Sequence, residues 1–233
     1  MGDRTMFITV NGIRLYYEKH GEGRPLVMLH GNGEDSTIFD RAWPILEKGF
    51  CCYLVDSRSH GQSEEGELHY ETMARDMFCF LEMLDLRDVI FYGFSDGGIV
   101  GLLTAAQTDR ISTLIVSGAN LSPMGVSFWT RTKTWFSWLR SGDEKLRLMM
   151  DEPHITDDIL AGIRANTLVL AGSSDLVDEK ETRHIAEMIQ GAELQILEGE
   201  DHGSYIVHCD KIANLIIDYC RQTMDVVQNG EKI

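Results

Sequence analysis

A serine flanked by glycines stands at position 95, in the run Gly93-Phe94-Ser95-Asp96-Gly97-Gly98. This G-x-S-x-G pattern follows the apolar run 88–92 and precedes a segment with helical spacing. A serine at such a junction lies on a sharp, strained turn that lifts its hydroxyl above the sheet, where it can attack a carbonyl carbon. Nucleotide-binding turns of the G-x-G-x-x-G or G-x-x-x-x-G-K type are absent from the sequence. The spacing therefore favours Ser95 as a nucleophile for acyl transfer.

An attacking serine needs a base, and the base needs a carboxylate that orients it. Of the eight histidines, His202 lies after the last apolar run and before the last helical segment. Asp175 follows another apolar run and precedes Asp178, which is better placed to begin a helix. Loops that follow parallel strands open at the same edge of a sheet, so Ser95, His202 and Asp175 are expected to meet there. His60 remains a competing candidate for the base.

The tetrahedral oxyanion of an acyl transfer needs two N–H donors. The Asp96 N–H, directly after the serine, supplies one, and the Asn32 N–H in His30-Gly31-Asn32-Gly33 is our candidate for the other. The alternative for the Asn32 loop is a turn that merely ends a strand. No Cys or His cluster has the spacing of a metal site. We expect no cofactor and no metal, because the chain itself supplies the nucleophile, the base and the oxyanion donors.

The hydrophobic pattern predicts the elements that position these groups. Two apolar stretches around Asn11-Gly12 predict a β-hairpin. Continuous apolar runs, typical of strands buried on both faces, recur at 25–29, 51–55, 89–92, 113–116, 167–170 and 193–197. Helical spacing lies between them at 36–47, 70–84, 96–107, 179–189 and 205–221. This alternation predicts an α/β fold with a mostly parallel sheet, helices on both faces and an N-terminal β-hairpin.

The alternation stops between residues 121 and 164, where no strand is evident. Three of the four tryptophans, Trp129, Trp135 and Trp138, lie in this segment. We expect residues 1–120 and 165–233 to form the core and 121–164 to form a helical cap. The tryptophans would then bind the apolar part of a substrate. The alternative is an ordinary pair of helices docked on the core.

Length and charge narrow the classes of partner. A chain of 233 residues suits one domain. Its 37 acidic and 21 basic residues give a net charge of −16, which repels phosphate groups, so we expect neither a nucleic acid nor a membrane as partner. No apolar run approaches the roughly 18 residues that span a bilayer, and no secretory signal is visible at the N-terminus. The five cysteines form no C-x-x-C pair, which favours free thiols and a cytoplasmic location.

Together these motifs resemble the α/β-hydrolase family over nearly the whole chain, in the family's order of serine, aspartate and histidine. The run 56–63 resembles the family's D-x-R-G-x-G-x-S turn, with Ser59 where glycine is usual. That turn is normally structural, so we expect Arg58 and His60 to order the loop. Residues 93–99 and 118–120 are similar to the valacyclovir-hydrolase-like branch, which hydrolyses amino-acid esters.

The resemblance implies a serine hydrolase acting on a small to medium carboxylic ester, with an amino-acid ester among the candidates. A carboxylate at Asp96, with Glu34 and Asp35 nearby, would attract a positively charged substrate; alternatively, Asp96 is an acid favoured by the start of a helix. The same groups serve thioesterases, amidases and C–C bond hydrolases. A slow-turnover ligand receptor or signalling protein of this fold would also keep them. The sequence leaves the oligomeric state open.

Overall fold

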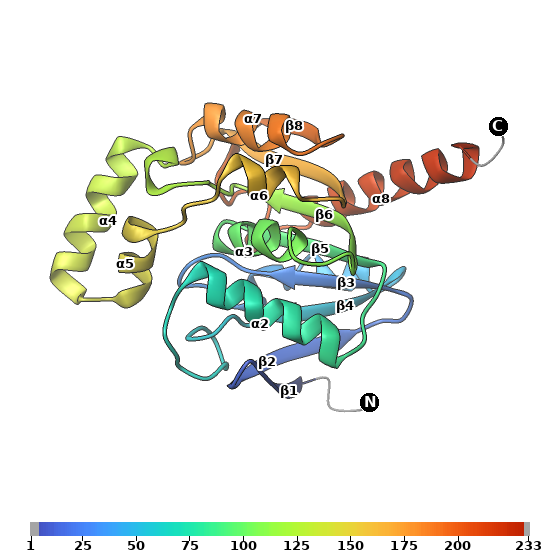
Figure 1. Ribbon diagram of the computed structural model, residues 1–233, viewed down its shortest axis with the longest axis horizontal. Coiled ribbons are helices and arrows are strands. Elements are labelled where there is room, and N and C mark those ends of the chain that lie inside the picture. The colour runs from blue at the N-terminus through green and yellow to red at the C-terminus, as the bar shows by residue number, and fades with distance from the viewer. Residues whose placement is uncertain (1–4, 231–233) are drawn as a thin grey trace.

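A computed structural model of the protein describes the backbone of residues 5–230 and the side chains of residues 6–223. One eight-stranded sheet crosses the molecule in the order β1-β2-β4-β3-β5-β6-β7-β8 (Figure 1). Strand β2 pairs antiparallel with β1 and β4, and every other pair is parallel. The strands are β1 (Thr5–Val10), β2 (Ile13–His20), β3 (Arg24–Leu29), β4 (Phe50–Val55), β5 (Val89–Phe94), β6 (Ile111–Ser117), β7 (Asn166–Ser174) and β8 (Glu193–Asp201). The expected α/β architecture, with its N-terminal hairpin, is confirmed.

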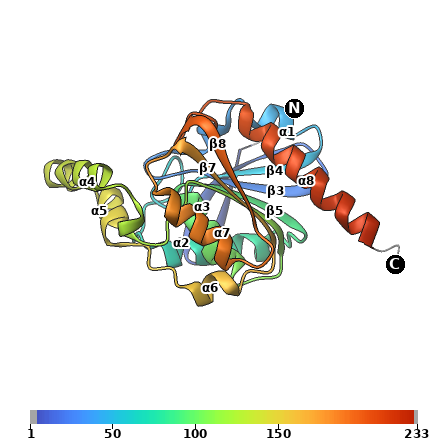
Figure 2. The same ribbon diagram turned by 90° about the horizontal axis from the view of Figure 1, so that it is seen from above.

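Helices cover both faces of the sheet, as the view from above shows (Figure 2). One face packs against α2 (Tyr70–Met83), α3 (Asp96–Ala105), α6 (Asp157–Ala161) and α7 (Glu179–Met188). The other packs against η1 (Ser36–Phe39), α1 (Trp43–Leu46) and α8 (Lys211–Gly230). The sheet is thus buried on both sides, which explains its uninterrupted apolar strands. No helix in the described part of the chain is both long and apolar enough to cross a bilayer.

Two predicted helices differ from the structure. The helix expected over 36–47 forms as two pieces, η1 and α1, because Pro44 has no N–H to donate to a carbonyl one turn earlier. The helix expected from residue 205 begins only at Lys211. His208 interrupts it with a φ of 49°, outside the helical range, while its N–H donates to the Ile38 carbonyl at 2.9 Å.

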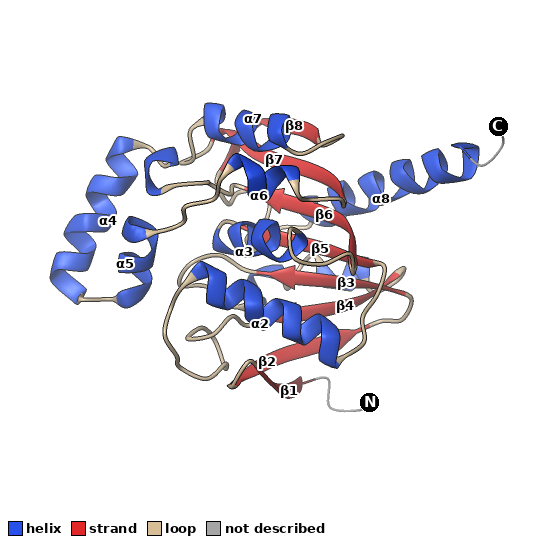
Figure 3. Cartoon of the chain, in the orientation of Figure 1, coloured by secondary structure: helices blue, strands red, loops and turns tan. Residues whose placement is uncertain are grey.

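The segment 121–164 holds only helices among its elements (Figure 3): η2 (Pro123–Gly125), α4 (Phe128–Ser141), α5 (Glu144–Asp151) and α6. Helix α4 projects from the body on the side opposite to α8, with α5 between it and the sheet (Figures 1 and 2). The excursion is closed at its base, where the Ile155 N–H donates to the Leu121 carbonyl at 2.9 Å. Nearby, the Ser127 N–H donates to the Leu176 carbonyl, also at 2.9 Å. The role of this segment as a cap stays a prediction.

Candidate active site

Ser95 occupies the turn between β5 and α3 in a strained conformation, with φ at 53° and ψ at −116°. Its N–H donates to the Ser117 carbonyl on the neighbouring strand β6 at 2.8 Å, which holds the turn in place. A Cβ at Gly93 would collide with the Gly97 carbonyl, and one at Gly97 with the Leu29 carbonyl. Only glycine at both positions allows the strand, the turn and the helix to approach so closely.

His202 links Ser95 to Asp175. Its Nε2 lies 3.1 Å from Ser95 Oγ, and its Nδ1 lies 2.6 Å from Asp175 Oδ1. Because the carboxylate can only accept, we assign the proton of the neutral imidazole to Nδ1, which leaves Nε2 free to accept the serine hydroxyl. The Asp175 side chain is only 3% exposed, and Oδ1 also accepts the Val177 N–H at 3.0 Å. This arrangement can take a proton from Ser95 and hold the imidazolium that results.

The loop after β8 fixes the position of His202. Asp201 accepts the N–H groups of Gly203 and Ser204 at 3.0 and 2.9 Å, which folds the loop tightly. On the opposite side, Gly118 has a φ of 62°, and a Cβ there would lie 2.6 Å from His202 Cε1. The sequence shows Gly118 only as part of a family resemblance. Its steric role becomes apparent only in the structure.

A neutral histidine, His30, holds the loop after β3 in place. His30 donates from Nδ1 to the Gly31 carbonyl at 2.8 Å and accepts the Ser57 N–H at Nε2, at 3.0 Å. Complete burial lowers the pKa of His30 to about 4, so the ring stays uncharged at neutral pH. Among the hydrogen bonds of the described residues, the N–H groups of Asn32 and Asp96 have no protein acceptor. Both predicted oxyanion donors are therefore unoccupied by the protein itself.

His60, the competing histidine, lies in the structural turn below this loop. Its Nδ1 donates to the Arg58 carbonyl at 2.8 Å, and its ring packs 5.1 Å from that of His30. Arg58 forms a buried two-point ion pair with Asp76, at 2.6 and 2.7 Å. Ser59 adopts a φ of 61°, and its hydroxyl donates to the Gly66 carbonyl at 2.8 Å, which compensates for the missing glycine. The histidine that contacts Ser95 is His202.

The Asp96 side chain is buried, with 3% of its surface exposed. It accepts the Asn32 side-chain amide at 2.8 Å and a hydrogen bond from the Tyr70 phenol. Burial raises its pKa to about 6, although these two bonds act in the opposite direction. The same Asn32 amide donates to the Lys145 carbonyl of α5 at 3.1 Å, so Asp96 is linked to the excursion. No pattern in the sequence pointed to Tyr70, which reaches the site from α2.

Glu34 is a second carboxylate beside Ser95. It accepts the Gly31 N–H at 3.0 Å, and burial raises its pKa. A Cβ on Gly31 would lie 2.8 Å from the Glu34 carboxylate and 3.1 Å from Ser95 Cβ, so both groups flank the same glycine. Proximity to Asp96 also raises the pKa of Glu34, while His202 opposes that shift. The carboxylate thus adds negative charge close to the nucleophile.

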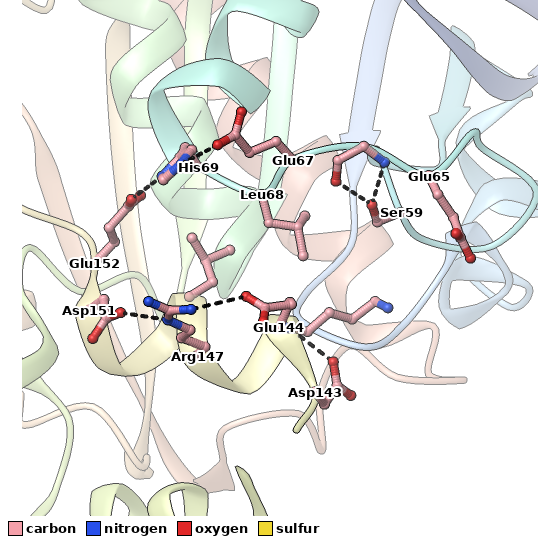
Figure 4. Close-up of a pocket in the computed structure, with 13 residues that line it drawn as sticks. Ser59, Glu65, Glu67, Leu68, His69, Asp143, Glu144, Arg147, Asp151 and Glu152 are labelled. Carbon is pink, nitrogen blue, oxygen red and sulfur yellow. Dashed lines mark hydrogen bonds and ion pairs between the residues drawn. The ribbon is translucent and has the colours of Figure 1, made fainter. Parts of the chain in front are cut away.

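A groove of about 730 Å³ runs between the loop 59–69 and α5 (Figure 4). Six carboxylates line it against Lys145 and Arg147, so its field is acidic. His69 reaches across to Glu152 at 2.5 Å, and Arg147 lies 3.3 Å from Asp151. Because the Lys145 carbonyl also accepts the Asn32 amide, this acidic groove adjoins the oxyanion loop.

The structure does not bring the three predicted substrate-binding tryptophans to Ser95. All three lie on α4, none of whose residues is buried. Trp129 is 72% exposed and Trp135 46% exposed. Trp135 lines a hollow of about 240 Å³ with Met149 and Met150, and Ser95 is not part of that lining. A second hollow lined by Trp135, of about 420 Å³, does not include Ser95 either.

No group of three or more His, Cys, Asp or Glu side chains within the described residues is arranged to hold a metal ion. The five cysteines are free thiols. What the site offers chemically is therefore a serine, a histidine, carboxylates and backbone N–H groups.

Comparison with known proteins places these observations in a family. The sequence profile of the alpha/beta hydrolase fold matches residues 24–143. Serine hydrolase BPHL of Mus musculus is 23% identical, over 91% of this chain and 84% of its own. An esterase from Exiguobacterium antarcticum superposes with a TM-score of 0.79 at 23% identity, covering 93% of this chain and 99% of its own. A meta-cleavage product hydrolase from Pseudomonas fluorescens IP01 superposes at 0.78 with 18% identity, covering 94% and 98%.

Proposed function

The chain belongs to the alpha/beta hydrolase fold family, and on that premise we propose that it is a serine hydrolase that cleaves a small to medium carboxylic ester. The observation that carries the proposal is the continuous contact from Ser95 Oγ to His202 Nε2, at 3.1 Å, and from His202 Nδ1 to Asp175, at 2.6 Å. The name of the BPHL relative, a serine hydrolase, agrees with it.

In the proposed reaction, Ser95 Oγ attacks the ester carbonyl while His202 Nε2 takes the hydroxyl proton. The Asn32 and Asp96 N–H groups stabilise the oxyanion. His202 then returns the proton to the leaving alcohol, and an acyl group remains on Ser95. Water, deprotonated by His202, hydrolyses this intermediate, releases the acid and restores the serine. Asp175 orients the imidazole and stabilises its positive charge throughout.

A fluorophosphonate probe tests the nucleophile directly. It should add once, at Ser95, as peptide mass spectrometry would show, and Ser95→Ala should remain unlabelled. A panel of p-nitrophenyl esters of graded acyl length, assayed beside thioesters, amides and C–C cleavage substrates, identifies the bond that is cleaved. Turnover in Ser95→Ala should fall on the order of 10⁴–10⁶-fold. Labelling at another residue of active protein would reject the assignment, and negligible kcat on every substrate would indicate a receptor-like role.

Two carboxylates near Ser95, those of Asp96 and Glu34, favour an ester substrate that carries a positively charged group, such as an α-ammonium. Among the ion pairs of the described residues, none joins Asp96 or Glu34 to a Lys or Arg; the Asn32 amide donates to Asp96 and the Gly31 N–H to Glu34, and both donors are neutral. An ammonium group would supply the missing counter-charge in a site of low dielectric. The acidic groove beside Lys145 would favour the approach of such a cation.

The test compares a free α-amino ester with its N-acetyl counterpart. The free amine is expected to have a kcat/KM about 10-fold to 150-fold higher, the range for a charge-assisted hydrogen bond. Asp96→Asn and Glu34→Gln identify which carboxylate is responsible, since only that variant should lose the preference. Equal rates on both esters in the wild type would exclude an ammonium subsite.

A further inference from the structure

Helix α4 turns a row of large apolar side chains to solvent. Phe128, Trp135, Phe136 and Leu139 are spaced i, i+7, i+8 and i+11, so they share one face of the helix. Their exposed fractions run from 46% to 64%, and Trp129, beside Phe128, is 72% exposed. Proteins rarely leave such a contiguous apolar row uncovered unless it binds something. We therefore regard this face, residues 128–139, as an interaction surface.

The charges of α4 are all positive. Arg131, Lys133 and Arg140 are its only ionisable side chains, although the whole chain has a net charge of −16. Arg131 lines two hollows beside the helix, of about 240 and 420 Å³. Its Nε is buried without a hydrogen-bond partner in the part of the chain that the structure describes. A basic helix of this kind is complementary to a negatively charged partner that also offers apolar contact.

We propose that α4 lies on the surface of an anionic lipid bilayer. Aromatic and aliphatic side chains on one face, with Lys and Arg but no acid elsewhere, are typical of helices that bind in the plane of a membrane interface. The apolar row would enter the boundary between headgroups and acyl chains, and the basic side chains would contact lipid phosphates. A second copy of the chain fits less well, because pairing two α4 faces would bring three positive charges from each helix together with no carboxylate on either.

The acidity of the rest of the molecule does not prevent this contact. Helix α4 is the outermost element on its side of the molecule in both perpendicular views, with α5 behind it, and α8 projects from the opposite side (Figures 1 and 2). At physiological ionic strength, charges more than about 8 Å apart in solvent are largely screened. The bilayer would therefore meet the three positive charges of α4 before it meets the acidic body. The net charge of −16 predicts that an anionic bilayer repels the chain as a whole, and the basic helix α4 is a local exception to that repulsion.

Binding to vesicles tests the proposal without any assay of activity. The full chain is mixed with vesicles of phosphatidylcholine alone or with added phosphatidylglycerol, and binding is measured by co-sedimentation and by tryptophan emission. Three of the four tryptophans lie on α4, so insertion should shift the emission to the blue. Three basic residues, each worth about fivefold, predict roughly 100-fold tighter binding to the anionic vesicles, reduced at high salt.

Two matched pairs of variants separate α4 from the rest of the surface. Phe136→Ser with Leu139→Ser should weaken binding at least tenfold, whereas Phe7→Ser should not; all three side chains are more than half exposed, so the fold should tolerate these changes. Circular dichroism verifies that it does.

The second pair reverses charge. Lys133→Glu with Arg140→Glu should abolish the preference for anionic vesicles. Arg87→Glu with Arg164→Glu changes the net charge equally, at side chains that are 71% and 82% exposed, and should leave the preference intact.

Wild-type protein that binds anionic vesicles no better than neutral ones would overturn the proposal. Equal losses of vesicle binding in the α4 variants and in their controls would also overturn it. Sedimentation velocity without lipid tests whether the same face instead binds a second copy of the chain. A dimer that Phe136→Ser with Leu139→Ser dissociates, together with no vesicle binding, would assign the face to a second copy and reject the bilayer.

Discussion

Replacing Asp96 by asparagine should change the stability of the protein in a way that depends on pH. Burial raises the pKa of Asp96 from an ordinary 3.8 to about 6 in the folded protein. Between these two values the folded chain holds a proton that the unfolded chain has released. The favourable contribution of this group to folding is therefore present at low pH and is lost as the pH rises through about 6.

The size of the effect follows from the same two values. The full shift corresponds to about 3 kcal/mol. About 1 kcal/mol of this is already lost at pH 4.5, and nearly all of it at pH 7.5. Asparagine carries no charge, so the variant does not lose this stabilisation as the pH rises. It offers only one acceptor oxygen to the two donors, Asn32 and Tyr70, and this mismatch costs roughly 1–3 kcal/mol at every pH. The free energy of unfolding of Asp96→Asn relative to wild type should therefore rise by about 2 kcal/mol from pH 4.5 to pH 7.5.

Urea unfolding of both proteins across this pH range measures the difference, and titrating groups common to both cancel. Asp109→Asn, at a side chain that is 81% exposed, is the matched control and should show no such rise. A difference for Asp96→Asn that stays constant across the range would refute the reasoning. It would mean that the carboxylate is ionised at no cost in the folded protein.

The remaining predictions concern the imidazole, its support and the aromatic helix. His202→Ala should remove turnover by about 10⁴-fold or more in a folded protein, whereas His60→Ala should lower the free energy of unfolding by about 1–3 kcal/mol and keep most of the turnover; the reverse pattern would show that the base is misassigned. Gly118→Ala should reduce kcat more than KM, because its Cβ would lie 2.6 Å from the imidazole, and wild-type kcat would contradict that contact. Under the cap hypothesis, Trp135→Ala should raise KM for long acyl esters more than for acetate, and an unchanged acyl-length profile would argue against it.

Apolar patterning predicts the sheet well because most of its strands are buried on both faces. Strand β5, for example, is buried at every position. The same patterning cannot locate helix ends that depend on distant contacts. His208 leaves the helical range while its N–H bonds Ile38, about 170 residues earlier in the chain, so spacing alone could not place the start of α8.

In the candidate site, too, sequence patterns predict some residues, while contacts between distant elements determine others. Ser95, Asp175 and His202 each follow a strand, so a rule about strand ends brings them together in the sequence and the structure alike. Asp96 shows what such rules leave out. Local spacing places the residue beside the nucleophile, but it does not predict that a contact between α2 and α3 buries the side chain against Tyr70. Aromatic content likewise predicts that Trp135 packs on something, but it does not say which face of α4 lacks a partner.

The narrow base of the excursion between β6 and β7 makes that segment exchangeable. Residues 122–154 leave and return beside the hydrogen bond between Leu121 and Ile155, and two further backbone bonds, Ser127 to Leu176 and Asp178 to Gly125, hold their first turn to the loop after β7. The strands on either side, β6 and β7, pair directly with each other. An insertion of different length or composition that keeps the bonds to Leu176 and Asp178 would leave the register of the sheet unchanged, and with it the spacing of serine, histidine and aspartate. Selection could thus change the outer helices without changing the arrangement of Ser95, Asp175 and His202 beneath them. A laboratory graft of a relative's excursion between the same two residues is the corresponding engineering route.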